Sequence, residues 1–132
     1  MSTPGTEGVS HTALTVTDLD ASVAWYTRIF EAMILWQEDQ GDHKFVLLFA
    51  PPLAIGLNTH AATSAKDMFD ERRVGLDHIS FQVENRDALE AWAKRLDELD
   101  IAHSPVTEAP YGTVLVFRDP DNIQLEFFAL PG

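Results

Sequence analysis

The sequence predicts an α+β fold in which one β-α-β-β-β module occurs twice along the chain. The first observation is an internal repeat, because a shift of 67 residues (78 − 11) lays HTALTVTDLDASVAWY (11–26) on HISFQVENRDALEAWA (78–93). The second is that in each copy the apolar residues first alternate with polar ones, as in a strand, and then recur at helical spacing. The third is the length, since 132 residues suit one domain and leave no room for a second large one.

The repeat also sets the expected organisation of the chain. We expect a single domain over 1–132, with module one at 9–60, a connector at 61–73 and module two at 74–130. The connector, AATSAKDMFDERR, follows neither period cleanly. It is expected to be a linker with room for a short helix, and its apolar and basic residues would also suit a lid over a cavity.

In module one, a strand is expected from His11 to Val16, where apolar residues alternate with polar ones. A helix follows, with apolar residues at helical spacing at Leu19, Val23, Tyr26 and Phe30. Three further strands are predicted at MILWQE (33–38), KFVLLFA (44–50) and LAIGLNTH (53–60), with the turn sequence DQGDH between the first two.

Module two repeats the order. Its first strand is expected at 78–83, and its helix carries apolar residues at Leu89, Trp92, Leu96 and Leu99. The remaining strands are predicted at AHSPVT (102–107), GTVLVF (112–117) and NIQLEFF (122–128), separated by APYG and RDPDN.

Composition narrows the kinds of partner. The chain has no cysteine, so disulfides, thiolate metal sites and cysteine nucleophiles are excluded and a metal would need nitrogen or oxygen ligands. Nine Lys and Arg against 21 Asp and Glu give a net charge of −12, which disfavours nucleic acid and anionic membrane surfaces as partners. No targeting or membrane-spanning segment is evident, and we expect a cytoplasmic protein.

Strand alternation explains a carboxylate inside an apolar run. In the last strand, Ile123, Leu125 and Phe127 share one face, so Glu126 points to the other. The same argument places His11 and His78 on the face opposite the apolar residues of their strands. Because an unpaired buried charge costs several kcal/mol, Glu126 needs a partner, and two imidazoles with one carboxylate suit a divalent metal.

These motifs resemble the vicinal oxygen chelate superfamily, which includes glyoxalase I, bleomycin-resistance and fosfomycin-resistance proteins and extradiol dioxygenases. The resemblance covers 9–129 and rests on His11 followed by TDLDASVAWYTRIF, on GLDHISF around His78, and on FRDPDNIQLEFF around Glu126. It implies that the modules form a half-open barrel around a metal held by His11, His78 and Glu126. The metal implied is Fe2+, Mn2+, Zn2+, Co2+ or Ni2+.

One departure narrows the implied activity. Gly56 lies where glyoxalase I is expected to supply a second metal-binding carboxylate, so the glyoxalase I reaction is not expected. Asn58 and His60 alternate onto the face of Gly56, and His60 is expected as an extra ligand or general base. By resemblance to the dioxygenases, His60 and Tyr111 are expected as catalytic residues. Asn58 and Phe128 are expected to contact substrate.

The resulting expectation is a small metal-dependent enzyme of the lyase, isomerase or dioxygenase type that binds vicinal oxygens of a small organic molecule. The alternative is a metal-free, bleomycin-resistance-like protein that sequesters a drug or metabolite. We also expect a homodimer, because each sheet would leave one face and its edge strands uncovered.

Overall fold

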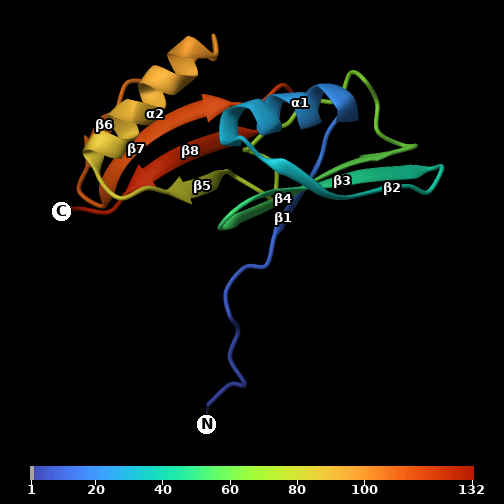
Figure 1. Cartoon of the computed structure of the whole chain (residues 1–132), viewed down its shortest axis with the longest axis horizontal. Coiled ribbons are helices and arrows are strands. Elements are labelled where there is room, and N and C mark those ends of the chain that lie inside the picture. Colours follow the sequence, from blue (N-terminus) through green and yellow to red (C-terminus); the bar gives the residue numbers. More distant parts are fainter. Residues whose placement is uncertain (1) are drawn as a thin grey trace. The chain divides into compact units, whose positions relative to one another are not determined.

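The structure is a computed structural model that describes residues 2–132. Its elements follow the order β-α-β-β-β twice (Figure 1). They are β1 (Thr12–Thr15), α1 (Leu19–Phe30), β2 (Met33–Asp39), β3 (His43–Ala50), β4 (Leu53–His60), β5 (Ile79–Gln82), α2 (Arg86–Glu98), β6 (Thr107–Ala109), β7 (Gly112–Arg118) and β8 (Gln124–Ala129). The α+β fold and the repeated module are therefore confirmed.

The strands form two four-stranded sheets, one from each copy of the module. Sheet one has the order β1-β4-β3-β2 and sheet two the order β5-β8-β7-β6. In each, the first strand of the module pairs in parallel with the last, and the other pairs are antiparallel. The chain divides into two compact units, Met1–Lys66 and Asp67–Gly132, and the division falls inside the predicted connector.

Each sheet packs one face against the helix of its own unit. In unit one the buried residues include Leu14, Val46 and Leu57 from the strands and Tyr26 and Ile29 from α1. In unit two Leu125 and Phe127 are buried, and the ring of Trp92 in α2 stacks on that of Phe127 with centroids 4.2 Å apart (Figure 1 shows α2 over β7 and β8). We call the opposite face of each sheet its open face.

The helices begin at equivalent positions of the repeat. The side chain of Asp18 accepts a hydrogen bond from the backbone N–H of Ala21 at 3.1 Å, and that of Asn85 accepts one from Ala88 at 3.0 Å. These are N-caps, in which a short polar side chain satisfies a helix N–H that has no partner within the helix. Among residues 2–132, neither helix has the length and apolar character needed to cross a bilayer.

One predicted strand was wrong. The segment 102–107 makes only an isolated bridge from His103 to Phe117 before β6 begins at Thr107. Pro105 lacks an N–H and restricts the residue before it, which interrupts the ladder. The connector contains turns and no helix within the described residues.

His103 fastens this irregular segment to α2. One ring nitrogen lies 2.6 Å from the carbonyl oxygen of Ser104 and the other 2.7 Å from the carboxylate of Asp97. Because both partners accept, the doubly protonated ring satisfies both. The bond to the Ser104 carbonyl, and secondarily that to Asp97, raises the pKa of His103 above its usual value.

This raised pKa predicts a pH-dependent stability. A group whose pKa is higher in the folded state stabilises the fold at pH values below its unfolded pKa, and this contribution is lost as the pH rises through the folded pKa. We therefore expect the free energy of unfolding to fall as the pH rises from the usual histidine pKa of about 6.5 through the raised pKa of His103. Urea unfolding at several pH values should show this slope reduced in H103Q and partly reduced in D97N. An unchanged slope in H103Q would contradict the assignment.

Candidate functional site

The clearest site geometry lies on the open face of sheet two, where His78 meets Glu126. His78 directly precedes β5, and parallel pairing sets Ser80 of β5 opposite Glu126 of β8. The Nε2 atom of His78 lies 3.6 Å from Oε1 of Glu126. The side chain of Glu126 is 17% exposed and that of His78 41%, so the pair lies at a partly buried position that solvent reaches.

The hydrogen bonding of His78 suits a metal ligand. Its Nδ1 lies 2.7 Å from the carboxylate of Asp77, which can only accept when ionised, so Nδ1 carries the proton. When the ring is neutral, Nε2 therefore presents its lone pair toward Glu126. Two acceptors that face each other in this way form a favourable pair only with a proton or a cation between them. An imidazole whose other nitrogen is bonded to a carboxylate is a common arrangement at metal centres.

Unit one contains the equivalent position without the carboxylate. His11 directly precedes β1, as His78 precedes β5, and parallel pairing sets Ala13 opposite Gly56 as it sets Ser80 opposite Glu126. Gly56 therefore occupies the place in unit one that Glu126 occupies in unit two. A Cβ atom built at Gly56 would lie 3.5 Å from that of Ala13, an ordinary contact, so a side chain fits there. Nδ1 of His11 lies 3.1 Å from the hydroxyl of Ser10.

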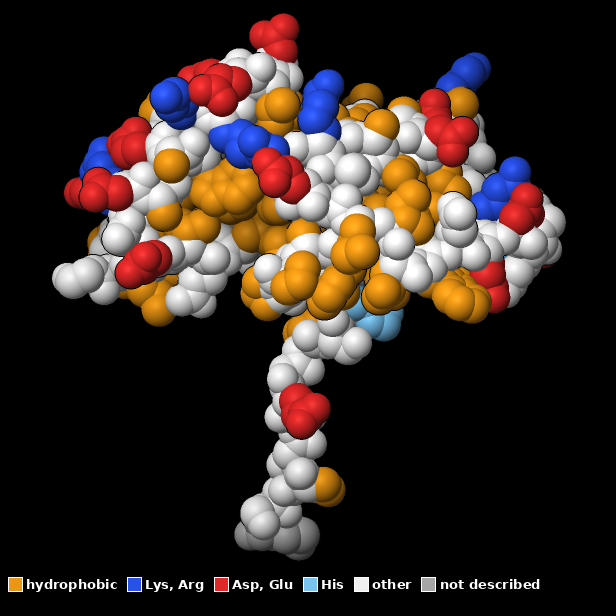
Figure 2. Space-filling model, in the orientation of Figure 1, with side chains coloured by type: hydrophobic (Ala, Val, Ile, Leu, Met, Phe, Trp, Pro, Cys, Tyr) orange, Lys and Arg blue, Asp and Glu red, His pale blue; other side chains and the backbone are white. Residues whose placement is uncertain are grey.

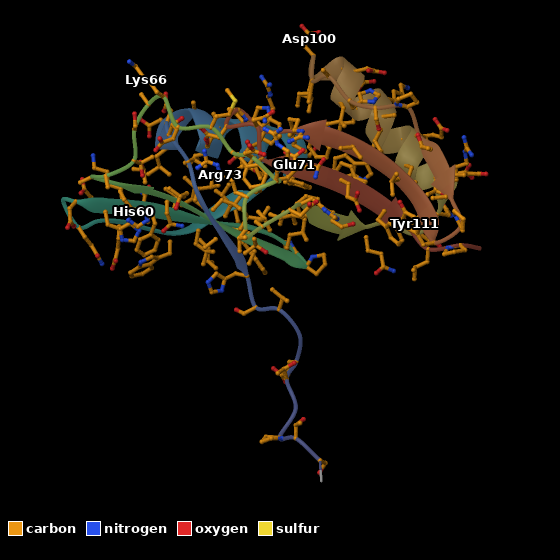
Figure 3. The ribbon with its side chains drawn as sticks, turned by 180° about the vertical axis from the view of Figure 1, so that it is seen from behind. His60, Lys66, Glu71, Arg73, Asp100 and Tyr111 are labelled. Atoms are coloured by element: carbon orange, nitrogen blue, oxygen red, sulfur yellow. The ribbon has the colours of Figure 1, made fainter. Side chains whose placement is uncertain are left out.

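The open face of sheet one carries a group of imidazole and aromatic rings. The rings of His43 and His60, which are partners across β3 and β4, stack with centroids 4.4 Å apart and planes 1° apart (Figure 3 labels His60). His43 also stacks on Phe45 at 5.5 Å. Sequence reasoning missed His43, although its alternation with Phe45 in the strand is the signal that places the two on one face.

Asn58 lies in the same group and both ends of its amide are used within unit one. Its Nδ2 donates to the carbonyl oxygen of Leu14 at 3.4 Å, and its Oδ1 lies 2.9 Å from Nε2 of His43. Because the amide oxygen accepts, His43 donates from Nε2. The amide thus orients the ring that stacks on His60.

Tyr111 and Phe128 lie close together in sheet two (Figure 3 labels Tyr111). Tyr111 directly precedes β7, whereas Arg118 is at the opposite end of that strand. Their rings are stacked with centroids 6.3 Å apart, and Phe128 alternates onto the open face with Glu126. A Cβ atom at Gly112 would overlap the Phe128 ring, and the φ of Gly112 is +155°, so glycine is needed for this ring position.

The structure thus places the predicted site residues in two groups. Sheet two brings together His78 and Glu126, with Tyr111 and Phe128 on the same face, and sheet one carries His11, Asn58 and His60. Among residues 2–132 no group of three or more His, Asp or Glu side chains is gathered closely enough to hold a metal ion. His78 and Glu126 supply one nitrogen and one oxygen donor, which fits a divalent metal that takes its further ligands from elsewhere.

The repeated module and its His and Glu positions define a class of small two-module α+β proteins with polar residues on the open faces of their sheets. The sequence from residue 8 to 127 matches the family model of the Glyoxalase/Bleomycin resistance protein/Dioxygenase superfamily. The chain belongs to this superfamily. A comparison with curated proteins found no match.

Solved structures agree with this membership. The chain resembles a glyoxylase/bleomycin resistance protein/dioxygenase domain from Frankia sp. EAN1pec, with 41% identity, a TM-score of 0.87, and 96% of this chain and 94% of that one covered. It also resembles the fosfomycin resistance protein FosX from Listeria monocytogenes, with 22% identity, a TM-score of 0.73, and 96% and 94% covered. A variant of that FosX, complexed with Mn(II) and 1S,2S-dihydroxypropylphosphonic acid, has 25% identity, a TM-score of 0.71, and 96% and 93% covered.

Proposed function

We propose that this protein is a metal-dependent enzyme that binds neighbouring oxygen atoms of a small organic substrate, with His11, His78 and Glu126 as metal ligands. The observation that carries the proposal is the His78–Glu126 pair, in which the imidazole Nε2 faces a carboxylate oxygen at 3.6 Å. Membership of the superfamily and the Mn(II) complex of the FosX variant support a divalent metal. The metal would be Fe2+, Mn2+, Zn2+, Co2+ or Ni2+.

His11 is assigned by its equivalence to His78. Both residues directly precede a strand that pairs in parallel with the last strand of its unit. A divalent ion at these ligands would supply Lewis-acid polarisation of the substrate oxygens.

The remaining residues have roles that follow from their contacts. His60 would exchange a proton with the substrate, and the stacked ring of His43, oriented by Asn58, would hold it in place. Asn58 therefore contributes to substrate binding by ordering this pair. Tyr111 would supply a phenolic hydroxyl at the open face of sheet two, and Phe128, on which it stacks, would form an apolar wall for the substrate.

The charges on the sheets argue against a phosphonate substrate. Among the described strands, Lys44 and Arg118 are the only Lys or Arg residues. Lys44 alternates away from His43 and Phe45 and so lies on the helix side of its sheet, whereas Arg118 is paired with Glu71 at 2.9 Å. Because neither is available to bind an anion, we propose a substrate without a phosphonate group, unlike the phosphonic acid in the complex of the FosX variant.

A protein that sequesters a small molecule without metal is the second candidate. Its support is the amount of apolar surface in unit one, where Met33, Ile34, Leu35 and Trp36 of β2 are each about half exposed or more (49–60%; Figure 2 shows exposed hydrophobic side chains). Metal analysis of the purified protein separates the two candidates, since only the enzyme requires stoichiometric metal.

The first test replaces Glu126 by Gln, which keeps the size of the side chain and removes its charge. Metal affinity, measured by titration calorimetry, should fall by more than the 10- to 100-fold typical of losing an outer-shell partner. The matched control is Glu108→Gln on β6, an exposed carboxylate paired with Arg86, and it should bind metal as the unaltered protein does. Circular dichroism should be unchanged in both variants. Stoichiometric metal with unaltered affinity in E126Q would overturn the ligand assignment.

The second test concerns Gly56. The metal-loaded protein should not convert a glutathione hemithioacetal at a useful rate, because unit one lacks a carboxylate at the position equivalent to Glu126. Gly56→Glu should introduce measurable activity, while Gly56→Ala should fold equally well and remain inactive. Product formation followed by absorbance checks this, and rapid turnover by the unaltered protein would contradict it.

We further propose that the protein is a homodimer. The edge strand β2 exposes four consecutive apolar residues, 33–36, which a second copy would cover. The net charge of −12 opposes association, but salt screens such repulsion over roughly 8 Å at physiological ionic strength.

Sedimentation at micromolar concentration should therefore give a dimer. Refolding a mixture of His11→Ala and Glu126→Gln proteins then asks whether the metal ligands come from two chains. If they do, each mixed dimer regains one metal site, whereas ligands from a single chain regain none. A monomer in the sedimentation experiment would remove the dimer proposal.

A further inference from the structure

His78 has a second carboxylate neighbour that the ligand assignment does not use. Asp77 accepts from Nδ1 of His78 at 2.7 Å, on the opposite side of the ring from Glu126. The Asp77 side chain is 66% exposed, so without support it would exchange freely between conformers. What holds Asp77 therefore decides how well the ring of His78 is oriented.

Gln124 provides that support from the last strand. It lies two residues before Glu126 in β8 and so alternates onto the same face. Its Nε2 donates to the side-chain oxygen Oδ1 of Asp77 at 3.2 Å and to the backbone oxygen of Asp77 at 3.3 Å. One amide group thus holds both the side chain and the backbone of Asp77.

Arg118 fixes which end of that amide faces Asp77. The Nη2 atom of Arg118 lies 3.2 Å from Oε1 of Gln124. A guanidinium can only donate, so the oxygen end of the amide must face Arg118 and the nitrogen end must face Asp77. If the amide turned over, both contacts would place like groups against each other.

Glu71, from the predicted connector, holds Arg118 in turn. Its two carboxylate oxygens accept from Nη1 and Nη2 of Arg118, each at 2.9 Å, in a bidentate pair (Figure 3 labels Glu71). Arg118 also donates to the backbone oxygen of Asn122 at 3.1 Å. The hydrogen bond from Arg118 lowers the pKa of Glu71 to about 2, so the carboxylate is ionised throughout the physiological range.

We propose that Asp77 is a positioning residue for His78 and that Glu71, Arg118 and Gln124 form a relay that holds Asp77 in place. Each member has a fixed donor or acceptor role, so the relay specifies one tautomer of His78, with the proton on Nδ1 and the lone pair of Nε2 toward Glu126. The connector would thereby control metal affinity from a residue seven positions before His78 in the sequence (78 − 71). This proposal rests on the proposed role of His78 and Glu126 as metal ligands.

Two variants test the relay at its ends. Asp77→Ala removes the acceptor for Nδ1 of His78. Glu71→Gln removes the negative charge that pairs with Arg118. The control is Asp70→Asn, which breaks a neighbouring bidentate pair with Arg72 (2.9 Å for both bonds) that is not part of the relay. Asp70 also has its pKa lowered to about 2 by hydrogen bonds from Arg72, so both variants remove an ionised carboxylate from a bidentate pair.

The first measurement is the tautomer of His78 in the metal-free protein. Two-bond ¹H–¹⁵N correlation spectra at about pH 8, where an ordinary imidazole is neutral, should show the Nδ1–H form in the unaltered protein and in D70N. D77A should show mainly the Nε2–H form that isolated neutral histidine prefers, and E71Q a mixture of the two. Unchanged spectra in both D77A and E71Q would overturn the proposal.

The second measurement is Mn2+ affinity by calorimetry. D77A should lose about 10- to 100-fold, E71Q should lose less in the same direction, and D70N should match the unaltered protein. The two measurements separate the two proposals. If the unaltered protein binds no Mn2+ or other divalent metal, the proposed function fails, while the spectra still decide whether the relay sets the tautomer. If metal binds and D77A changes neither tautomer nor affinity, the relay alone is wrong.

Discussion

The parallel pairing of the first strand of each unit with its last is the constraint on which the rest of the structure depends. Parallel neighbours cannot be joined by a tight turn, so each unit places a helix and two strands between them. The helix covers one face of the sheet, and alternation along the strands then leaves polar residues on the other face. The same pairing sets the second residue after each leading histidine opposite a defined position of the last strand. That position is Glu126 in unit two and Gly56 in unit one.

Much of this followed from local sequence patterns. The repeat and the change from strand spacing to helical spacing within each copy are visible in the order of apolar and polar residues, and the structure has both. Alternation also predicted that His78 and Glu126 lie on the same face. A strand has only two faces, and the apolar residues of these strands occupy the one that packs against the helix. The segment 102–107 was predicted as a strand, but Pro105 interrupts the ladder there, and the paired strand begins only at Thr107.

The contacts that were missed link residues far apart in the chain. Arg118 meets Glu71 across 47 positions, and Gln124 meets Asp77 across the same separation. No periodicity connects such pairs, because their proximity depends on strand order and on rotamers that the packed protein selects. His43 is different, since its place beside Phe45 was visible in the alternation. Its stacking on His60 required the antiparallel register of β3 and β4, which the sequence left undetermined.

The glycine at position 56 has a consequence for the charge of the proposed centre. A divalent ion bound by two neutral imidazoles and one carboxylate retains a net charge of +1, whereas a carboxylate at position 56 would bring that charge to zero. A centre with residual positive charge attracts an ionised oxygen of an incoming molecule and strengthens the polarisation of that oxygen. It does so in a protein whose overall charge is strongly negative. A ligand that carries its negative charge on the bound oxygen alone, and is otherwise neutral, would therefore be favoured over one that is anionic throughout.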